Sequence, residues 1–295
     1  MTRNINIDII KFIMSLLVIT IHFDYQSGQF ITQFIINELS RAAVPFFFII
    51  SGFFLIPTVE KNMHVNWLIK ILMIYISWSL VYFIYLKYFS NDRGGAYYLL
   101  EQITTGWYHL WYFPALIMGY IIAYHMRHRS LRSISSTIIL LLSVLFYLQI
   151  KKYGDVSLIS YRNFLFTAAP CIMSGLIIYR VRDMYTLKGI SKTLPMITGA
   201  IIIISLISYN YGLIIEVPLS SLIMAILIVS ITTKTKPLIS HSKINISKLS
   251  TVIYLTHPLF IGLANTHNYI ISYLLILTCC FISFVFLSLI KFKYI

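Results

Sequence analysis

Long apolar runs separated by short polar links fill the chain from end to end. One run, from Leu249 to Ile290, contains no Asp, Glu, Lys or Arg. About 20 apolar residues suffice for a helix to cross the ~30 Å hydrocarbon layer of a membrane. The pattern therefore predicts an all-α, polytopic membrane protein with about ten transmembrane helices. Their expected ranges are 7–25, 40–57, 67–88, 107–125, 133–150, 161–179, 193–209, 212–232, 248–266 and 269–290.

Composition agrees with this pattern. Of the 295 residues, 59% are hydrophobic and 11% charged, and the mean hydropathy is +0.83. A chain of this balance cannot form a single soluble core with a wettable surface. No long polar insertion or repeat interrupts it, so residues 1–295 are expected to form one membrane-embedded domain without an appended soluble domain. Three cysteines, Cys171, Cys279 and Cys280, lie in apolar stretches and suit neither a disulfide framework nor a metal site.

The distribution of basic residues predicts how the chain is oriented in the membrane. The formal charge is +14, but Lys and Arg fall in short clusters between apolar spans, which favours a bilayer rather than a nucleic acid as the partner. Placing both termini in the cytoplasm leaves only six of the 23 basic residues on the opposite side, as the positive-inside rule requires. A nine-helix count would instead put the termini on opposite sides. The six are Arg41, Lys87, Arg93, Lys151, Lys152 and Arg162.

Two ionisable residues share one face of the first predicted helix. Lys11 and His22 are eleven positions apart, which returns almost to the same helical angle about 16 Å further along. Charged residues inside a membrane helix are costly and therefore are functional candidates. Lys11 could also pair with Asp8 or extend to the interface. His22, near the outer end, can accept and return a proton near neutral pH.

Other polar residues are expected at the same outer level once the topology is imposed. An acyl-transfer site needs a base, a cation or donors for the oxyanion, and a carboxylate that orients the base. His257 precedes Pro258, so it could cap a loosened helical turn or contact substrate. Trp111 and Tyr112 suit an interfacial belt or a substrate contact. The remaining candidates are Glu38, Arg41, His109, Asn163 and Glu216, with Asp24 and Arg162 expected to be bystanders.

Several motifs in order resemble the acyltransferase 3 family of membrane acyltransferases. The first is Lys11 and His22 with ten residues between them, where the family usually has arginine at the first position. The second and most specific is RAAVPFFFIISGF, from Arg41 to Phe53. HLWYFPALI, YRNFLF and VIYLTHPLF resemble later landmarks. The resemblance covers roughly residues 5–290.

The resemblance implies an O-acetyltransferase of the bacterial inner membrane. Acetyl-CoA would be the cytoplasmic donor, and a hydroxyl of a surface polysaccharide or lipid-linked glycan the acceptor, without a metal. His22 would be the general base or, less readily, a transient acyl carrier, and Lys11 would contact CoA. A sugar transporter or a non-enzymatic membrane sensor are the alternatives. The expected catalytic partners are Glu38, Arg41, His109 and Glu216, and the expected substrate contacts are Trp111, Tyr112, Asn163 and His257.

Overall fold

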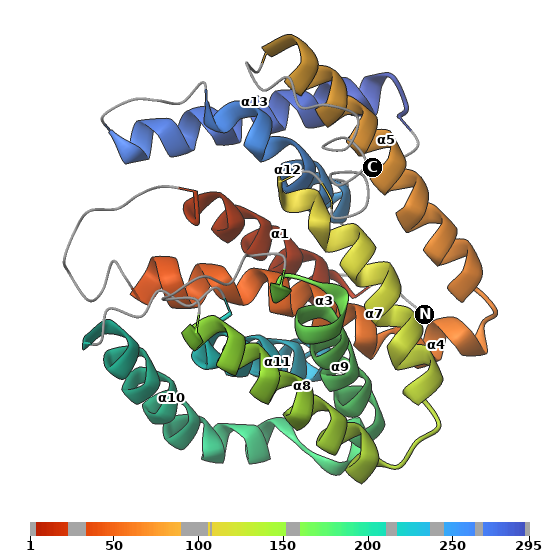
Figure 1. Cartoon of the computed structure of the whole chain (residues 1–295), viewed down its shortest axis with the longest axis vertical. Helices are drawn as coiled ribbons and strands as arrows, with labels where there is room; N and C mark the ends of the chain where they lie inside the picture. Colours follow the sequence, from red (N-terminus) through yellow and green to blue (C-terminus); the bar gives the residue numbers. More distant parts are fainter. Residues whose placement is uncertain are drawn as a thin grey trace.

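Every secondary-structure element in the described part of the computed structural model is helical, which confirms the all-α class for those residues (Figure 1). The structure describes residues 4–22, 34–89, 106, 108–151, 160–210, 217–236, 245–262 and 268–292. The α-helices are α1 (Ile5–Thr20), α3 (Ala43–Phe53), α4 (Leu55–Glu60), α5 (His64–Phe89), α7 (Tyr112–Met126), α8 (Leu131–Lys151), α9 (Ala169–Val181), α10 (Leu187–Asn210), α11 (Leu219–Lys234), α12 (Ile246–Ile261) and α13 (Tyr269–Leu289).

Short helical segments of other geometry lead into several of these helices. The π-helix η1 (Phe34–Leu39) and the 3-10 turn η2 (Ser40–Ala42) precede α3, and a second π-helix, η5 (Phe164–Ala168), precedes α9. The 3-10 turns η3 (Tyr108–Trp111) and η6 (Arg182–Met184) precede α7 and follow α9. Such irregular turns are common at functional sites, and η1 and η3 carry Glu38 and His109.

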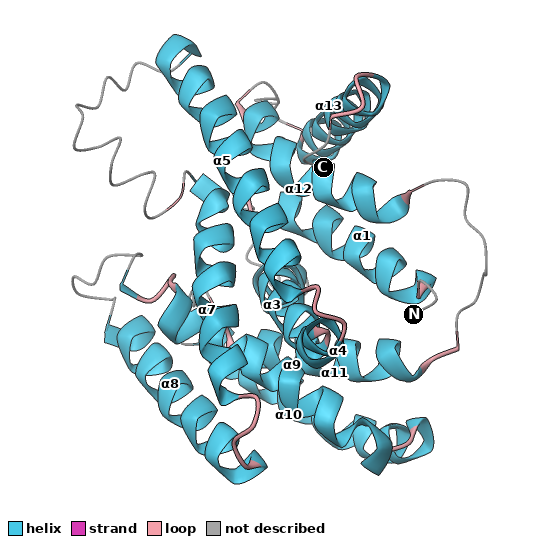
Figure 2. Ribbon diagram, turned by 90° about the vertical axis from the view of Figure 1, so that its right-hand side faces the viewer, coloured by secondary structure: helices cyan, strands magenta, loops and turns pink. Residues whose placement is uncertain are grey.

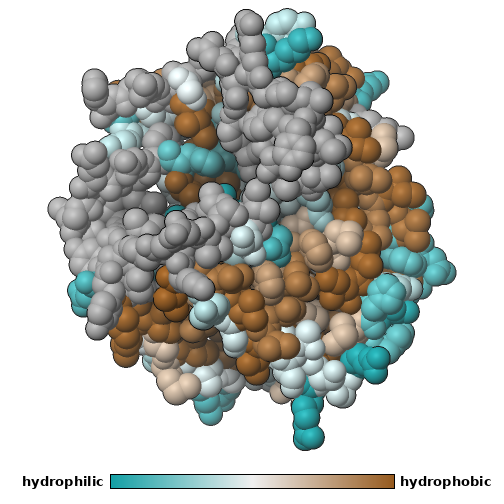
Figure 3. Space-filling view, viewed as in Figure 1, coloured by the Kyte–Doolittle hydropathy of each residue, from teal (hydrophilic) through white to brown (hydrophobic). Residues whose placement is uncertain are grey.

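Long apolar helices with apolar outer faces identify a membrane protein. Five helices in the described residues are long and apolar enough to cross a bilayer, and 40–53 and α11 are shorter apolar helices. Side chains such as Ile76 and Leu80 on α5 and Leu274 and Phe281 on α13 point outward and are exposed. Figure 3 shows hydrophobic surface across much of one face, with hydrophilic atoms toward its edges. The lipid acyl chains would cover these faces.

Each of the ten predicted spans overlaps one of these helices. The predicted boundaries differ from the observed ones by several residues, because caps and irregular turns set where each helix begins. For example, Asn4 caps α1 by accepting a hydrogen bond from the backbone N–H of Asn6, so α1 begins before the predicted position. The number of crossings and the cytoplasmic placement of both termini remain predictions.

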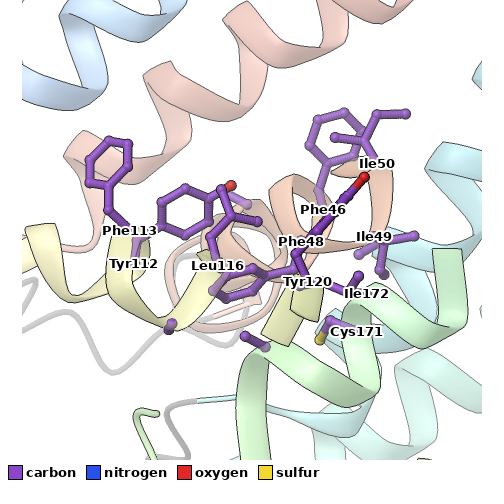
Figure 4. Packing of buried hydrophobic residues seen from close by; sticks show 14 of the residues in the cluster. Phe46, Phe48, Ile49, Ile50, Tyr112, Phe113, Leu116, Tyr120, Cys171 and Ile172 are labelled. Atoms are coloured by element: carbon purple, nitrogen blue, oxygen red, sulfur yellow. The ribbon is translucent and has the colours of Figure 1, made fainter. Parts of the chain in front are cut away.

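The core is densest where α3, α7 and α9 pack together (Figure 4). Gly52 of α3 lies against the Ile172 carbonyl of α9, and Gly175 of α9 lies against the Ile49 carbonyl of α3. A Cβ at either glycine would clash with backbone atoms of the other helix. Small residues are the usual means by which membrane helices approach this closely. This glycine seam fixes α3 against α9, and α7 packs on the same unit through Gly119.

The helices α1 and α12 lie side by side and run in the same direction (Figure 2). The Ser250 hydroxyl, near the start of α12, donates a hydrogen bond of 2.9 Å to the Lys11 carbonyl. Further along both chains, the Nε2 atoms of His22 and His257 are 3.2 Å apart. The parallel pair therefore places lysines together at one end and histidines together at the other.

Candidate active site

Three histidines from three separate segments meet just past the end of α1 and beside the second half of α12. His257, from α12, is completely buried, and its ring centroid lies 5.1 Å from those of both His22 and His109. His22 directly follows α1, where its backbone N–H donates to the Ile19 carbonyl at 3.2 Å. The side chain of His22 is exposed. We call His22, His109 and His257 the histidine end; His109 and His257 are buried residues, and His22 is an exposed one.

His109 is enclosed by aromatic rings. Its ring lies edge-on to Tyr82 and Tyr254, with centroid distances of 5.3 and 5.1 Å. The Tyr254 hydroxyl donates to the His109 carbonyl at 2.9 Å, and the Tyr82 hydroxyl donates to the Leu255 carbonyl at 2.9 Å. Neither ring nitrogen of His109 has a hydrogen-bond partner among the described residues, although the side chain is only 8% exposed. A buried imidazole whose nitrogens have no protein partner can form hydrogen bonds to a ligand or to water.

Arg162 joins the histidine end from the segment just before η5. It is close enough to His22 and Tyr254 for its charge to act on both side chains. The sequence indicated Arg162 as a bystander, because nothing in its local pattern reports that residues 160–163 return to the end of α1. Its position makes it a candidate for stabilising negative charge that develops beside His22.

A cavity of about 480 Å³ lies at the other end of the α1/α12 pair. Lys11, Lys70 and Lys248 line it, from α1, α5 and α12, and no carboxylate is among the described residues that line it. Lys70 and Lys248 are exposed, and Lys11 is half-buried. We call these three lysines and their cavity the lysine end. Its volume and charge suit an anionic small molecule.

Aromatic residues form the inner walls of this cavity. Trp67 and Tyr120 lie with ring centroids 4.7 Å apart, and both line the cavity. The Tyr120 hydroxyl is buried and has no hydrogen-bond partner among the described residues. Flat aromatic surfaces suit stacking on a ligand ring, and the hydroxyl offers it a polar contact.

Two tyrosines connect the ends. Tyr112 and Tyr254 also line the cavity. Tyr254 also contacts His109, and its ring centroid lies 6.1 Å from that of His257. Tyr112 stacks on Phe48 of α3 with centroids 4.6 Å apart, so the glycine-seam unit fixes its position. The order from one end to the other is therefore cavity, Tyr254, His109, His257 and His22.

Glu38 and Arg41, both predicted catalytic residues, belong to a neighbouring polar cluster. Glu38 is buried, its carboxylate accepts a hydrogen bond from the Ser220 hydroxyl, and its carbonyl accepts one from Ser221 at 2.7 Å. The charge of Arg41 acts on Glu38. The hydrogen bond of His22 goes to His257 rather than to Glu38. The cluster still adjoins the histidine end, because the hydroxyls of Thr20 and Ser40 are 2.5 Å apart.

The other predicted residues are dispersed. Asn163 caps η5, since its side-chain oxygen accepts from the N–H groups of Leu165 and Phe166 at 3.0 Å, so its amide already has a structural task. Trp111 contacts Phe48 and is half-buried. Glu216 and Asp24 lie outside the described residues. Within those residues, no group of three His, Cys, Asp or Glu side chains is placed to hold a metal ion.

The comparisons with known proteins identify the family. A family model described as "Acyltransferase domain" matches residues 4–293. The chain therefore belongs to the acyltransferase 3 family, as the motifs indicated, and acyl transfer is the activity of this class of protein. No solved structure matches the chain.

Curated relatives carry a different name. The chain is 28% identical to an "Amino-acid racemase" of Enterococcus faecalis over 94% of its own length, which is 45% of that protein. It is 30% identical to a "Serine/alanine racemase" of Enterococcus gallinarum over 40% of its length, which is 19% of that protein. The chain thus spans less than half the length of these relatives, and their names describe much longer proteins.

Proposed function

We propose that this protein transfers an acetyl group from cytoplasmic acetyl-CoA to a hydroxyl of a surface polysaccharide or lipid-linked glycan. The observation that carries the proposal is that the two ends of the α1/α12 pair differ in their chemistry. One end places three lysines around a cavity, and the other places a solvent-accessible imidazole beside two buried ones. A donor that is anionic at one extremity and reactive at the other matches this arrangement.

The lysine end suits the nucleotide part of CoA. Lysine ammonium groups bind phosphates as point charges, and three of them line the cavity, with no carboxylate among the lining residues that the structure describes. The Trp67 and Tyr120 rings offer the adenine a stacking surface. The thioester arm would then extend past Tyr254 toward His109. In this proposal Lys11 contacts CoA, as predicted from the sequence, together with Lys70 and Lys248.

The histidine end suits the reaction. His22 would take the proton of the acceptor hydroxyl as its oxygen forms a bond to the acetyl carbon and the carbon–sulfur bond breaks. The proton taken by His22 then passes to solvent, and the CoA thiolate takes one from water, which leaves an acetyl ester and CoA. The unpartnered nitrogens of His109 and the charge of Arg162 would stabilise the oxyanion.

A reconstituted assay tests the proposal. The purified full chain is placed in lipid vesicles with isotopically labelled acetyl-CoA and a lipid-linked glycan, and the product is analysed by mass spectrometry. Each modified glycan should gain the mass of one acetyl group. The His22→Ala protein should form far less product than the wild type, whereas the exposed-residue control His128→Ala should form as much. Glycan movement across the membrane without acetyl-CoA would instead support the transporter alternative.

The racemase names give a reason to test a second acceptor class. The same matched segment occurs within proteins named for amino-acid chemistry. Serine carries a hydroxyl, so the assay should include free serine beside the glycan. Acetylation of serine alone would keep the acyl-transfer chemistry and replace the proposed acceptor.

A further inference from the structure

His257 is held by the turn of α12 that Pro258 loosens. Its Nδ1 lies 3.0 Å from the Ile253 carbonyl and also interacts with the Tyr254 carbonyl. In a regular helix the Tyr254 carbonyl would accept from the N–H four residues later, but that residue is Pro258, which has none. The imidazole therefore occupies the place that the missing backbone donor leaves. This fixes the ring of His257 and leaves its Nε2 pointing away from its own helix.

The contacts of His257 determine which nitrogens carry protons. A carbonyl oxygen can only accept, so Nδ1 of His257 must be protonated. In the neutral imidazole, Nε2 is then an acceptor. Its partner, Nε2 of His22 at 3.2 Å, must donate. The neutral ring of His22 consequently has its lone pair at Nδ1, on the side opposite His257.

The surroundings favour the neutral form of His257. Its side chain is completely buried, and an unpaired buried cation is very costly. The titratable and charged groups that act on the pair within the described residues are His109 from η3, Arg162 from the segment before η5 and Tyr254 from α12. None of them supplies a carboxylate to balance an imidazolium at position 257.

We infer that His257 is a positioning residue, which fixes the ring and the tautomer of His22 so that Nδ1 of His22 is the basic atom. This inference rests on the proposed function. When Nδ1 takes the hydroxyl proton, the resulting imidazolium keeps its Nε2–H bond to the lone pair of His257. A buried imidazole thus performs at His22 the orienting task that a carboxylate performs in a Ser-His-Asp triad. The proposal gives that task to His257, whose Nε2 lies 3.2 Å from Nε2 of His22, and not to Glu38.

Nitrogen NMR tests the tautomer without any substrate. The chain has eight histidines, so ¹⁵N-histidine labelling gives few signals, and those of His22 are the ones lost in His22→Gln. We expect a protonated Nε2 and an unprotonated Nδ1 in the neutral wild-type ring. A protonated Nδ1 would overturn the inference. Because no donor or acceptor is present, this result is independent of whether the acyl-transfer proposal holds.

Three substitutions at position 257 test the orienting role. Glutamine places an amide oxygen near the position of the histidine Nε2, whereas asparagine is too short to reach His22 and leucine has no acceptor. We expect His257→Gln to retain kcat within about threefold, and His257→Asn and His257→Leu to lower kcat by about 10- to 100-fold with KM unchanged, as expected for a hydrogen bond to a charged group. The Nε2 signal of His22 should shift in the asparagine and leucine proteins.

The glutamine and asparagine proteins form the matched pair, since both keep a polar amide in the buried position. Equal loss in the two proteins, with an unchanged Nε2 signal of His22, would show that His257 only supports the fold. Unaltered kcat in His257→Leu would also contradict the inference.

Discussion

The two ends of the α1/α12 pair are built from the same helices but differ in their exposure. At the lysine end, Lys70 and Lys248 are exposed at the mouth of a cavity. At the histidine end, His257 and His109 are buried among aromatic rings, and only His22 is exposed. Flexible cations suit capture of a hydrated anion, whereas a proton acceptor must be held in one orientation. Under the proposed function, this difference would separate donor binding from chemistry, with Tyr254 between them.

Removing the imidazole of His22 should have the largest effect and should be confined to the histidine end. We expect His22→Ala to lower kcat by roughly 10²–10⁴-fold, the usual contribution of a general base, while the KM for acetyl-CoA changes little. Steady-state kinetics in vesicles measures both constants. His128→Ala, at an exposed histidine in the turn after α7, is the control. A comparable loss in that control would show that the effect is not specific to the site.

The glycine seam positions the lysine end and the histidine end relative to each other. Disrupting the seam should therefore impair both ends. In Gly175→Ala the new methyl group would clash with the Ile49 carbonyl of α3. We expect a loss of roughly 2–5 kcal/mol of stability, in the range of overpacked or strained cores. Thermal unfolding in detergent measures this loss. Gly199→Ala is the matched control, because a Cβ there meets nothing within 4 Å. Equal melting temperatures for the two variants would contradict the stabilising role of the glycine seam.

Removing one lysine should affect binding alone. For Lys248→Ala we expect the KM for acetyl-CoA to rise by about tenfold, the effect of losing one charge-assisted contact, with kcat unchanged. The dependence of KM on salt should also weaken. Lys188→Ala, at an exposed lysine of α10 outside the cavity lining, should retain the wild-type KM. A fall in kcat without a change in KM would place Lys248 in the chemistry instead.

The smallest effect is expected at the boundary between the ends. Tyr254→Phe keeps the ring against His109 but removes the hydroxyl that donates to the His109 carbonyl at 2.9 Å. We expect kcat to fall by about three- to tenfold, consistent with one neutral hydrogen bond. Kinetic constants for both substrates measure it. A change in the acetyl-CoA KM as large as that in Lys248→Ala would mean that Tyr254 belongs to the lysine end.

Helix positions could be predicted from the sequence because hydrophobic periodicity is a local signal. The separation of Lys11 and His22 was also predictable, since α1 carries Lys11 and ends two residues before His22, so helical geometry fixes most of their relation. The motifs identified the family correctly. Boundaries were less accurate, because caps such as Asn4 and the turns η1 and η5 depend on backbone hydrogen bonds.

Contacts between distant segments could not be predicted in the same way. Lys248 and His257 repeat on α12 the lysine-to-histidine order of α1, but their pairing with α1 depends on helix packing. The same holds for Arg162, which the sequence indicated as a bystander and which lies close enough to act on His22. The capping role of Asn163 at η5 was not predicted either, because it depends on the backbone conformation of residues 163–166; its substrate contact stays a prediction.

The sidedness of the reaction tests most directly whether the lysine end binds the donor and the histidine end performs the transfer. Vesicles with the chain in one orientation receive labelled acetyl-CoA on one side and the glycan acceptor on the other. We predict labelled product only when acetyl-CoA is supplied on the side of Lys70 and Lys248, and far less of it with His22→Ala. Equal labelling from either side, or full labelling with His22→Ala, would contradict this division of binding and chemistry.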